Sequence, residues 1–185
     1  MAKISRRDEF LRLLDEHKGI LFKVASAYCR NALDREDLIQ EIVLAVWSSF
    51  GRYDHTRRFS TWMYRIAINV AISFCRREAR RPRPHGLLTG PSAEQAILKV
   101  VADAPESAEL ESELGVLKEC ISQLDELDRA LVILYLDGNR YETIAEILGI
   151  SETNVGTKIS RIKERIRRDW PDRQKRESAT WNSMN

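Results

Sequence analysis

The sequence predicts an all-α protein made of two small helical domains joined by a flexible linker, with a helix-turn-helix in the C-terminal domain. Apolar residues recur at helical spacing along both halves, and no segment alternates in the manner of a strand. Proline and glycine gather at 82–91, within a central linker, and cannot sustain a helix there. Towards the C-terminus, a glycine separates two periodic segments at helix-turn-helix spacing.

The N-terminal domain, residues 1–81, is expected to hold three helices. The first follows a Ser5 cap and continues at helical spacing to Tyr28. The second starts near Asp34 and ends at Gly51; its inward-facing residues are Leu38, Ile42, Val46 and Phe50, with Leu44 and Trp47 nearby. A basic loop then leads into a third helix, 60–80, whose apolar stripe comprises Trp62, Ile66, Val70 and Phe74.

The linker is expected over 82–107, with a short helical piece near 94–101. The C-terminal domain, 108–170, opens on apolar residues spaced four and three apart: Leu110, Leu114, Leu117, Ile121 and Leu124. A helix over 128–136 follows. The tail, 171–185, is short and polar and is expected to be disordered.

The helix-turn-helix is the strongest local signal. Its first helix would start at Tyr141 with Asn139 as cap, and small Ala145 would allow a close crossing. Gly149 falls at the turn, where a left-handed backbone favours glycine, and Ser151 caps the second helix. That helix carries a buried stripe of Val155, Ile159, Ile162 and Ile166. It also carries an outward stripe suited to base edges and phosphates: Asn154, Lys158, Arg161 and Arg165.

Charge is distributed in blocks. Charged residues make up 31% of the chain and nearly cancel to +2. Residues 52–83 are basic, opposed only by Asp54 and Glu78; residues 103–128 are acidic around a single Lys118; residues 158–176 are basic again. This pattern indicates two phosphate-binding surfaces separated by a segment that avoids DNA.

Several functional classes are disfavoured. No apolar run approaches the ~20 residues of a membrane span, and a signal-peptide core is missing, so we expect a cytoplasmic protein. Cys29, Cys75 and Cys120 lack the spacing of a disulfide framework or zinc site and are expected to be buried or inert thiols. Without a Gly-rich phosphate loop, a metal-ligand cluster or a nucleophile–base pair, we expect no catalytic residues, cofactor or metal, and therefore no enzyme.

The third helix also carries a basic stripe: Arg58, Arg65, Asn69, Arg76 and Arg80, interrupted by Ile72. Such a stripe beside aromatic residues suits single-stranded or melted DNA. Trp62 and Tyr64 could be stacking platforms for bases, but aromatics at helical spacing also serve as core residues, so both readings stay open.

The chain resembles the extracytoplasmic-function (ECF) sigma factors of the sigma-70 family in two segments. Their region 2 is similar to DREDLIQEIVLAVWSSF followed by RFSTWMYRIAINVAISFCRR. Their region 4 is similar to ISQLDELDRALVILYLDGNRYETIAEILGISETNVGTKISRIKERIRR. The resemblance implies a bacterial factor that binds core RNA polymerase and directs promoter-specific initiation by recognising and melting promoter DNA.

The resemblance also implies site residues. A core-polymerase contact on the clamp helices of the largest subunit would use Asp37, Gln40 and Glu41, although Asp37 equally suits a helix first turn. Recognition and melting of the minus-ten element, with a base flipped into a loop pocket, would use Arg57, Arg58, Arg65, Asn69, Arg76 and Arg77. Recognition of the minus-thirty-five element would use Thr153, Asn154, Thr157, Lys158, Arg161 and Arg165. An anti-sigma factor that clamps the two domains is a further partner that the family suggests.

Four positions depart from the family pattern. Asp125 stands where many members have proline, so the bend after Leu124 rests on capping by Asp125. Ile68 replaces a usual arginine and Ser73 an acidic residue, so the third helix lacks one charge and one polar contact. Asn154 replaces a common threonine, which leaves its contacted base open.

A helix-turn-helix regulator with a helical sensing domain is the alternative class. It would share the motif at 141–168 but would not need the DREDLIQE helix, and binding to core polymerase separates the two classes. Because the connecting segment is rich in proline and glycine, we also expect domains without a fixed mutual interface. Limited proteolysis near 80–83 or Lys99 should then release fragments of about 1–81 and 107–168.

Overall fold

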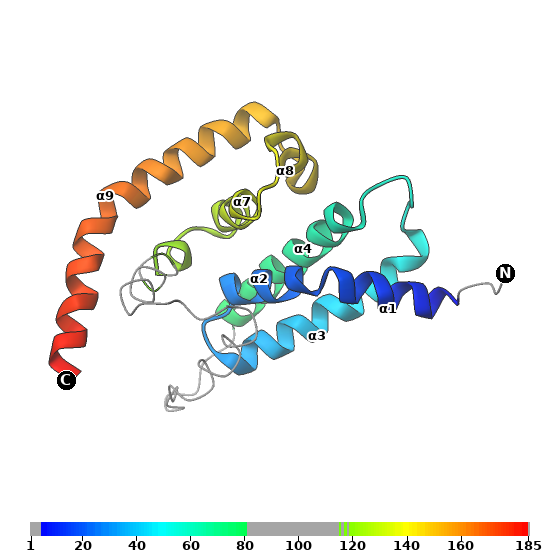
Figure 1. The fold of residues 1–185 in the computed structure, drawn as a ribbon, viewed down its shortest axis with the longest axis horizontal. Coiled ribbons are helices and arrows are strands. Elements are labelled where there is room, and N and C mark those ends of the chain that lie inside the picture. The colour runs from blue at the N-terminus through cyan, green and yellow to red at the C-terminus, as the bar shows by residue number, and fades with distance from the viewer. Residues whose placement is uncertain (1–4, 81–114, 116, 118, 185) are drawn as a thin grey trace.

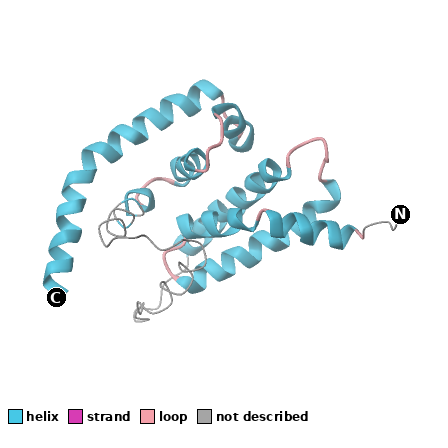
Figure 2. Ribbon diagram, viewed as in Figure 1, coloured by secondary structure: helices cyan, strands magenta, loops and turns pink. Residues whose placement is uncertain are grey.

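The computed structural model describes residues 5–80, 115, 117 and 119–184 of the chain. Within these ranges the elements are helical, and Figures 1 and 2 show two groups of helices, α1–α4 and α7–α9. This confirms the all-α, two-domain fold class. The expected linker at 82–107, its helical piece at 94–101, and Leu110 and Leu114 lie outside the described residues.

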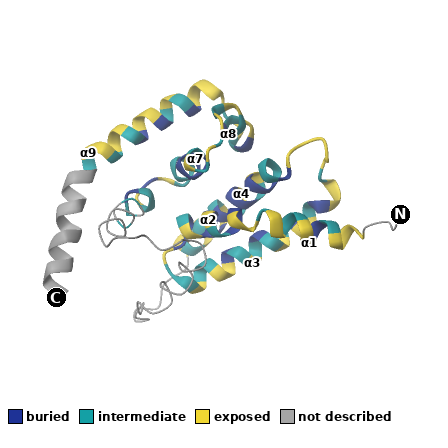
Figure 3. Cartoon of the chain, viewed as in Figure 1, coloured by how far each residue is buried: buried dark blue, intermediate teal, exposed yellow. Residues whose placement is uncertain are grey.

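The N-terminal domain consists of α1 (Arg6–Glu16), α2 (Lys18–Tyr28), α3 (Ala32–Ser49), the 3-10 turn η1 (Phe50–Arg52) and α4 (Phe59–Arg80). Helices α2, α3 and α4 pack on one another. Their inward-facing side chains are buried (Figure 3), and those with no exposed surface include Val24, Leu38, Ile42, Val46, Met63 and Ala67. This bundle fixes the directions in which α3 and α4 present their outer faces.

Two helix starts differ from the sequence prediction. The expected single helix from Ser5 to Tyr28 breaks at His17, whose backbone leaves the helical region at φ −118° and ψ 12°. His17 Nδ1 lies 2.9 Å from the carbonyl oxygen of Leu13, so the side chain closes the last turn of α1. Helix α3 begins before Asp34, because the Asp34 N–H donates to Asn31 Oδ1 at 2.7 Å and makes Asn31 the cap.

The C-terminal domain consists of a helical turn at 119–122, then α7 (Glu126–Leu136), α8 (Tyr141–Leu148) and α9 (Glu152–Met184). Capping by Asp125 is confirmed, since its Oδ1 accepts the Asp128 N–H at 2.7 Å. The expected Asn139 cap is wrong: Asn139 Nδ2 donates to the Leu134 carbonyl at 3.0 Å and closes α7 instead. Arg140 occupies the N-cap position of α8 without a side-chain bond.

Helix α9 continues to Met184, where the sequence predicts a disordered tail. Pro171 costs a helix one backbone donor, but the residues after it include strong helix formers such as Arg173, Gln174, Lys175 and Arg176. Figure 1 shows α9 curving along its length, as long helices commonly do. The expectation of disorder from residue 171 is therefore wrong for the backbone through Met184.

The two domains pack against each other. Helix α2 contacts α7 and α4 contacts α8, and one hydrophobic cluster runs through both domains. The expected absence of a fixed interface is therefore wrong. The physical reason lies in α4, which buries a second stripe, Tyr64 and Ile68, beside the Met63 and Ala67 stripe of its own domain. By contrast, the predicted stripe residues Trp62, Ile66 and Val70 are only partly buried.

Candidate nucleic-acid interface

The helix-turn-helix formed by α8 and α9 has the expected geometry. Gly149 takes the left-handed conformation at φ 68°, and its N–H donates to the Ala145 carbonyl at 2.9 Å. Ser151 Oγ accepts the Asn154 N–H at 3.2 Å and caps α9. The small core between the helices is buried and comprises Ile144, Val155, Ile159 and Ile162. The first turns of α9 are thereby held in place with one face open.

The predicted readers on α9 fall into two groups. Thr153, Asn154, Thr157 and Arg161 are exposed on the outer side of the helix. Lys158 is partly buried instead, and its Nζ lies 2.8 Å from Asp128 Oδ1 on α7. Arg165 is exposed, but its guanidinium donates to the Gln123 carbonyl at 3.4 Å. Lys158 and Arg165 therefore flank the open face and contact their own domain.

Ser160 is an exposed residue of α9 that the sequence interpretation missed. It follows Thr153 and Thr157 at helical spacing, four and three residues along, and so continues their side of the helix. The sequence could have identified Ser160 if every position opposite the buried stripe of α9 had been taken as exposed, and not the basic positions alone.

The six predicted minus-ten residues are all exposed, in two different settings. Arg58, Arg65 and Asn69 form no ion pair with other described residues. The other three bind carboxylates: Arg57 with Glu146 at 2.9 Å, Arg76 with Glu126 at 3.8 Å, and Arg77 with Glu41 at 2.5 Å. The first two pairs cross from α4 and its preceding loop to the C-terminal domain.

The loop before α4 is held by aromatic packing and by a turn. Tyr53 lies 4.9 Å from the Trp62 ring and 5.4 Å from the Phe59 ring, and its hydroxyl donates to the Arg57 carbonyl at 2.6 Å. Asp54 Oδ1 accepts the Thr56 N–H at 3.0 Å, which lowers the pKa of the Asp54 carboxyl. The loop that carries Arg57 is therefore shaped before any ligand arrives.

The two candidate stacking aromatics have different environments. Tyr64 is 2% exposed, and its hydroxyl donates to Asp137 Oδ2 at 2.5 Å, so in this structure it is an interface residue and no base can stack on it. Trp62 is partly buried in the aromatic cluster with Phe50 and Tyr53.

Helix α3 presents the predicted polymerase-binding residues. Asp37 and Gln40 are exposed, and Glu41 is partly buried beside Arg77. The same side of α3 exposes three large apolar side chains that sequence reasoning did not assign to it: Leu33 (72% exposed), Leu44 (66%) and Trp47 (39%). These residues follow one another with Asp37 and Gln40 at alternating spacings of four and three, a signal visible in the sequence.

The thiols have no reactive environment. Cys29 and Cys120 are buried and Cys75 is partly buried, as expected. Burial raises the pKa of Cys29 to about 12 and also raises that of Cys75. No cluster in the described part of the chain is suited to hold a metal ion. Over the same residues, no helix combines the length and hydropathy of a bilayer crossing.

Both domains match known families. The model described as Sigma-70 region 2 matches residues 13–81, and that described as Sigma-70, region 4 matches residues 114–166. The ECF RNA polymerase sigma factor SigW of Bacillus subtilis is 29% identical over 92% of this chain and 94% of its own. The ECF RNA polymerase sigma-E factor of Haemophilus influenzae is 33% identical over 72% of each chain.

Two solved structures share the fold. CnrH, in complex with the cytosolic domain of CnrY, matches 91% of this chain and 90% of its own with a TM-score of 0.60 and 22% identity. The sigma factor RpoE, in complex with the anti-sigma factor NepR from Bartonella quintana, matches 88% of this chain and 94% of its own with a TM-score of 0.62 and 20% identity. From the two family models and the ECF relatives together, we conclude that the chain belongs to the ECF sigma factors of the sigma-70 family, promoter-specific transcription initiation factors that act with core RNA polymerase and are not enzymes.

Proposed function

We propose that the protein initiates transcription through three surfaces. Two lie on a region 2 domain at 1–81, and the third lies on a region 4 domain at 108–170. The outer side of α3 docks on core polymerase, the loop before α4 and α4 itself bind the minus-ten element, and the open face of α9 binds the minus-thirty-five element. Because RNA polymerase works in the bacterial cytoplasm, we place the protein there.

The polymerase-binding surface comprises Asp37, Gln40 and Glu41. Its supporting feature is the exposure of Leu33, Leu44 and Trp47 on the same side of α3. Large apolar side chains gathered on one exposed face mark a protein-binding surface, and carboxylates beside them give the contact its orientation.

The minus-ten surface comprises Arg57, Arg58, Arg65, Asn69, Arg76 and Arg77. Melting exposes bases and leaves two phosphate backbones to be held, and a stripe of arginines can hold one of them. Tyr53 in the loop and Trp62 in the first turn of α4 supply aromatic surface beside this stripe, where an unstacked base can be received.

The minus-thirty-five surface comprises Thr153, Asn154, Thr157, Lys158, Arg161 and Arg165. A helix of this kind enters the major groove with its first turns against base edges. The open face supports base contacts by Thr153, Asn154, Thr157 and Arg161, whereas the tie between Lys158 and Asp128 favours a backbone-positioning role for Lys158.

An anti-sigma factor is a further proposed partner. Both solved relatives were captured with a bound protein, the cytosolic domain of CnrY in one and the anti-sigma factor NepR in the other. We extend that property to this chain as a proposal, and co-purification from the native host tests it.

The observation that carries the minus-ten assignment is the exposed group of Arg58, Arg65 and Asn69, on α4 and directly before it, whose two arginines form no ion pair within the described residues. Run-off transcription with purified core polymerase on genomic fragments identifies promoters. On such a promoter, Arg65→Ala should reduce strand opening, measured by permanganate reactivity of unpaired thymines. Arg7→Ala, an exposed arginine change on α1, is the matched control. If Arg65→Ala and Arg7→Ala open the promoter equally, the proposal that α4 takes part in melting is wrong.

A further inference from the structure

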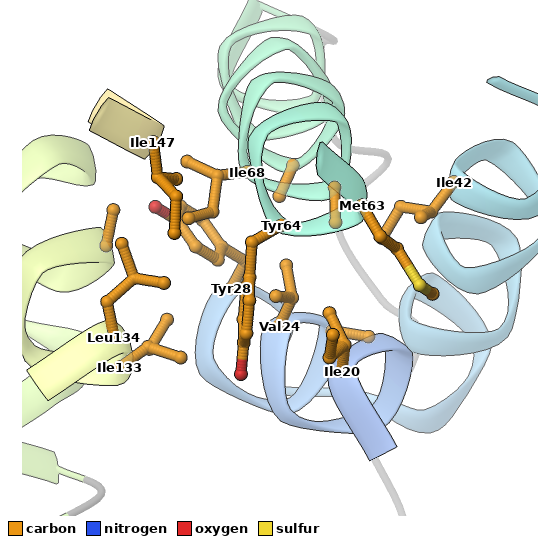
Figure 4. Packing of buried hydrophobic residues seen from close by; sticks show 14 of the residues in the cluster. Ile20, Val24, Tyr28, Ile42, Met63, Tyr64, Ile68, Ile133, Leu134 and Ile147 are labelled. Atoms are coloured by element: carbon orange, nitrogen blue, oxygen red, sulfur yellow. The ribbon is translucent and has the colours of Figure 1, made fainter. Parts of the chain in front are cut away.

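Helix α1 contributes little to the core of the N-terminal domain. That core forms where α2, α3 and α4 pack on one another. Figure 4 shows Met63 of α4 pointing towards Ile42 of α3, and both side chains are fully buried. Within Arg6–Glu16, which the structure describes in full, Phe10 is the buried residue. Most side chains of α1 are therefore available for contacts outside the bundle core.

The first turns of α1 cover the start of the loop at 53–58, which precedes α4. Arg6 Cζ lies 5.7 Å from the Trp47 ring centroid, a cation–π distance, and the Phe10 ring lies 5.3 Å from that of Phe50. The Arg6 guanidinium also lies against Gly51 of η1: a Cβ atom placed on Gly51 would be 2.5 Å from Arg6 Nη2. Gly51 has no positive φ, so backbone geometry does not require glycine there. What glycine provides is room for Arg6.

The rest of α1 contacts the middle and the end of the same loop. Glu9 Oε1 lies 3.7 Å from Nδ1 of His55, which is a loop residue. The ring of His17, the C-cap of α1, lies 5.2 Å from that of Phe59, the first residue of α4. Helix α1 therefore contacts the loop before α4 at its start, in its middle and at its end.

We infer that α1 braces the loop before α4, and that Arg6 is a positioning residue that acts on this loop through Gly51. By holding η1 in place, it sets where Arg57 and Arg58 meet the DNA backbone, without touching DNA itself. A loop that already has its bound shape loses less conformational freedom when a strand binds, so bracing raises the affinity for that strand. This inference rests on the proposed minus-ten function of the loop.

Gly51→Ala displaces Arg6 without removing a charge or a buried contact. The atoms in the way of the new methyl group are the far end of a flexible side chain, which can swing aside. Because alanine restricts the unfolded chain more than glycine does, the thermal midpoint should be unchanged or higher. Binding of the unpaired minus-ten strand should nevertheless be weaker, which a purely structural role for Arg6 would not produce. Gly19→Ala, at an exposed glycine of α2 with open space around its Cβ position, is the matched control.

The measurement uses holoenzyme reconstituted with saturating core polymerase, so that any change at Trp47, on the proposed polymerase-binding side of α3, does not enter. The ligand is a fluorescent single-stranded oligonucleotide that carries the minus-ten element of a promoter identified by run-off transcription. We expect Arg6→Ala to bind it about threefold more weakly than Arg7→Ala, the size of effect that one exposed cation–π contact accounts for. Arg6→Lys, which keeps a cation for the Trp47 ring, should recover part of this affinity.

A double variant tests whether Arg6 and Gly51 act together. Once Arg6 has been replaced by alanine, the added methyl group at position 51 no longer meets the guanidinium. Gly51→Ala should therefore cost nothing further in the Arg6→Ala background. Fully additive losses would overturn the inference. So would affinities of Arg6→Ala and Gly51→Ala that equal those of their controls, Arg7→Ala and Gly19→Ala.

Salt dependence separates positioning from a direct DNA contact. If Arg6 bound a phosphate itself, the affinity of Arg6→Ala would depend less steeply on salt concentration than that of Arg7→Ala. We expect equal slopes for the two variants, and a shallower slope for Arg6→Ala would overturn the positioning role.

Failure of the proposed function looks different. If Arg65→Ala binds the oligonucleotide as the wild type does and leaves core-dependent strand opening unchanged, the minus-ten assignment is wrong and the brace falls with it. If Arg65→Ala weakens binding while the Arg6 and Gly51 variants match their controls, only the brace is refuted.

Discussion

Lys158 Nζ lies 2.8 Å from Asp128 Oδ1, so a basic residue of α9 is tied to α7 of its own domain. The pair is less than one-third exposed on both sides. It therefore orients α9 relative to α7, and the side chains that are free to meet base edges are those on the outer face of α9.

Replacing Lys158 should weaken the fold more than it changes DNA selectivity. Lys158→Ala leaves the Asp128 carboxylate partly buried without its cation, and we expect a loss of about 1 kcal/mol in the free energy of unfolding. Denaturant titration measures this loss. Against a promoter library the variant should bind all sequences less well by a similar factor, and a changed preference at one position would contradict the positioning role.

Arg161 should behave in the opposite way. Its side chain is exposed on α9 and forms no ion pair within the described residues. Arg161→Ala should leave stability unchanged and cost ~1–3 kcal/mol on the best promoters, with relaxed preference at one base pair. A uniform loss over the whole library, with a shallower salt dependence, would instead identify a phosphate contact.

The apolar side chains on α3 should contribute to core-polymerase affinity and not to folding. Leu44 is 66% exposed, so Leu44→Ser should leave the thermal midpoint unchanged. We expect it to weaken binding to core polymerase by about 1 kcal/mol or more, as truncation of an interface anchor does. Leu11→Ser on α1, at 49% exposure, is the matched control. Equal binding by both variants would show that this side of α3 is not the docking surface.

Cutting the chain between the domains should not separate them. With a specific protease site introduced within 82–107, we expect the two fragments to elute together in gel filtration, because the Tyr28, Tyr64 and Ile147 contacts do not depend on the covalent connection. The double variant Tyr28→Phe with Tyr64→Phe should release a larger share of free fragments. Complete separation of the wild-type fragments would restore the view of two independent domains.

Stability should fall at alkaline pH through Tyr64. Burial, and then the hydrogen bond to Asp137, raise the pKa of this phenol above its ordinary value of 10.0. Above that value the unfolded chain loses the phenolic proton while the folded chain keeps it, so rising pH favours unfolding. Urea titrations from neutral pH to about pH 11 should show a shallower decline for Tyr64→Phe than for wild type. Parallel declines would mean that Tyr64 does not keep its proton in the folded state.

Local signals in the sequence predicted much of this fold. Gly149, Ser151 and Asp125 act at the positions where short-range backbone chemistry requires them. The break at His17 was missed because apolar spacing continues across it, and Asn139 was misassigned because an amide can cap the helix after it or close the helix before it. The second buried stripe on α4 could not be assigned, since Tyr64 and Ile68 read equally well as exposed or buried until their partner helix is known.

For the candidate site, too, the sequence predicted some features and not others. Residue types and spacing identified the basic positions of α4 and α9, because charge is visible in the sequence. The sequence does not show which of these cations already have a carboxylate partner, because the partners are far away along the chain. Glu146 is 89 positions from Arg57, Glu126 is 50 from Arg76, and Asp128 is 30 from Lys158.

The cluster that joins the two domains also has a consequence for the life of the unused protein. If the domains separated in water, Ile68, Leu134 and Ile147 would become a contiguous apolar surface, and such surfaces drive aggregation and degradation. A factor that waits for polymerase must survive that interval. In the folded arrangement these side chains cover one another, so we expect the intact protein to aggregate less readily than its separated domains.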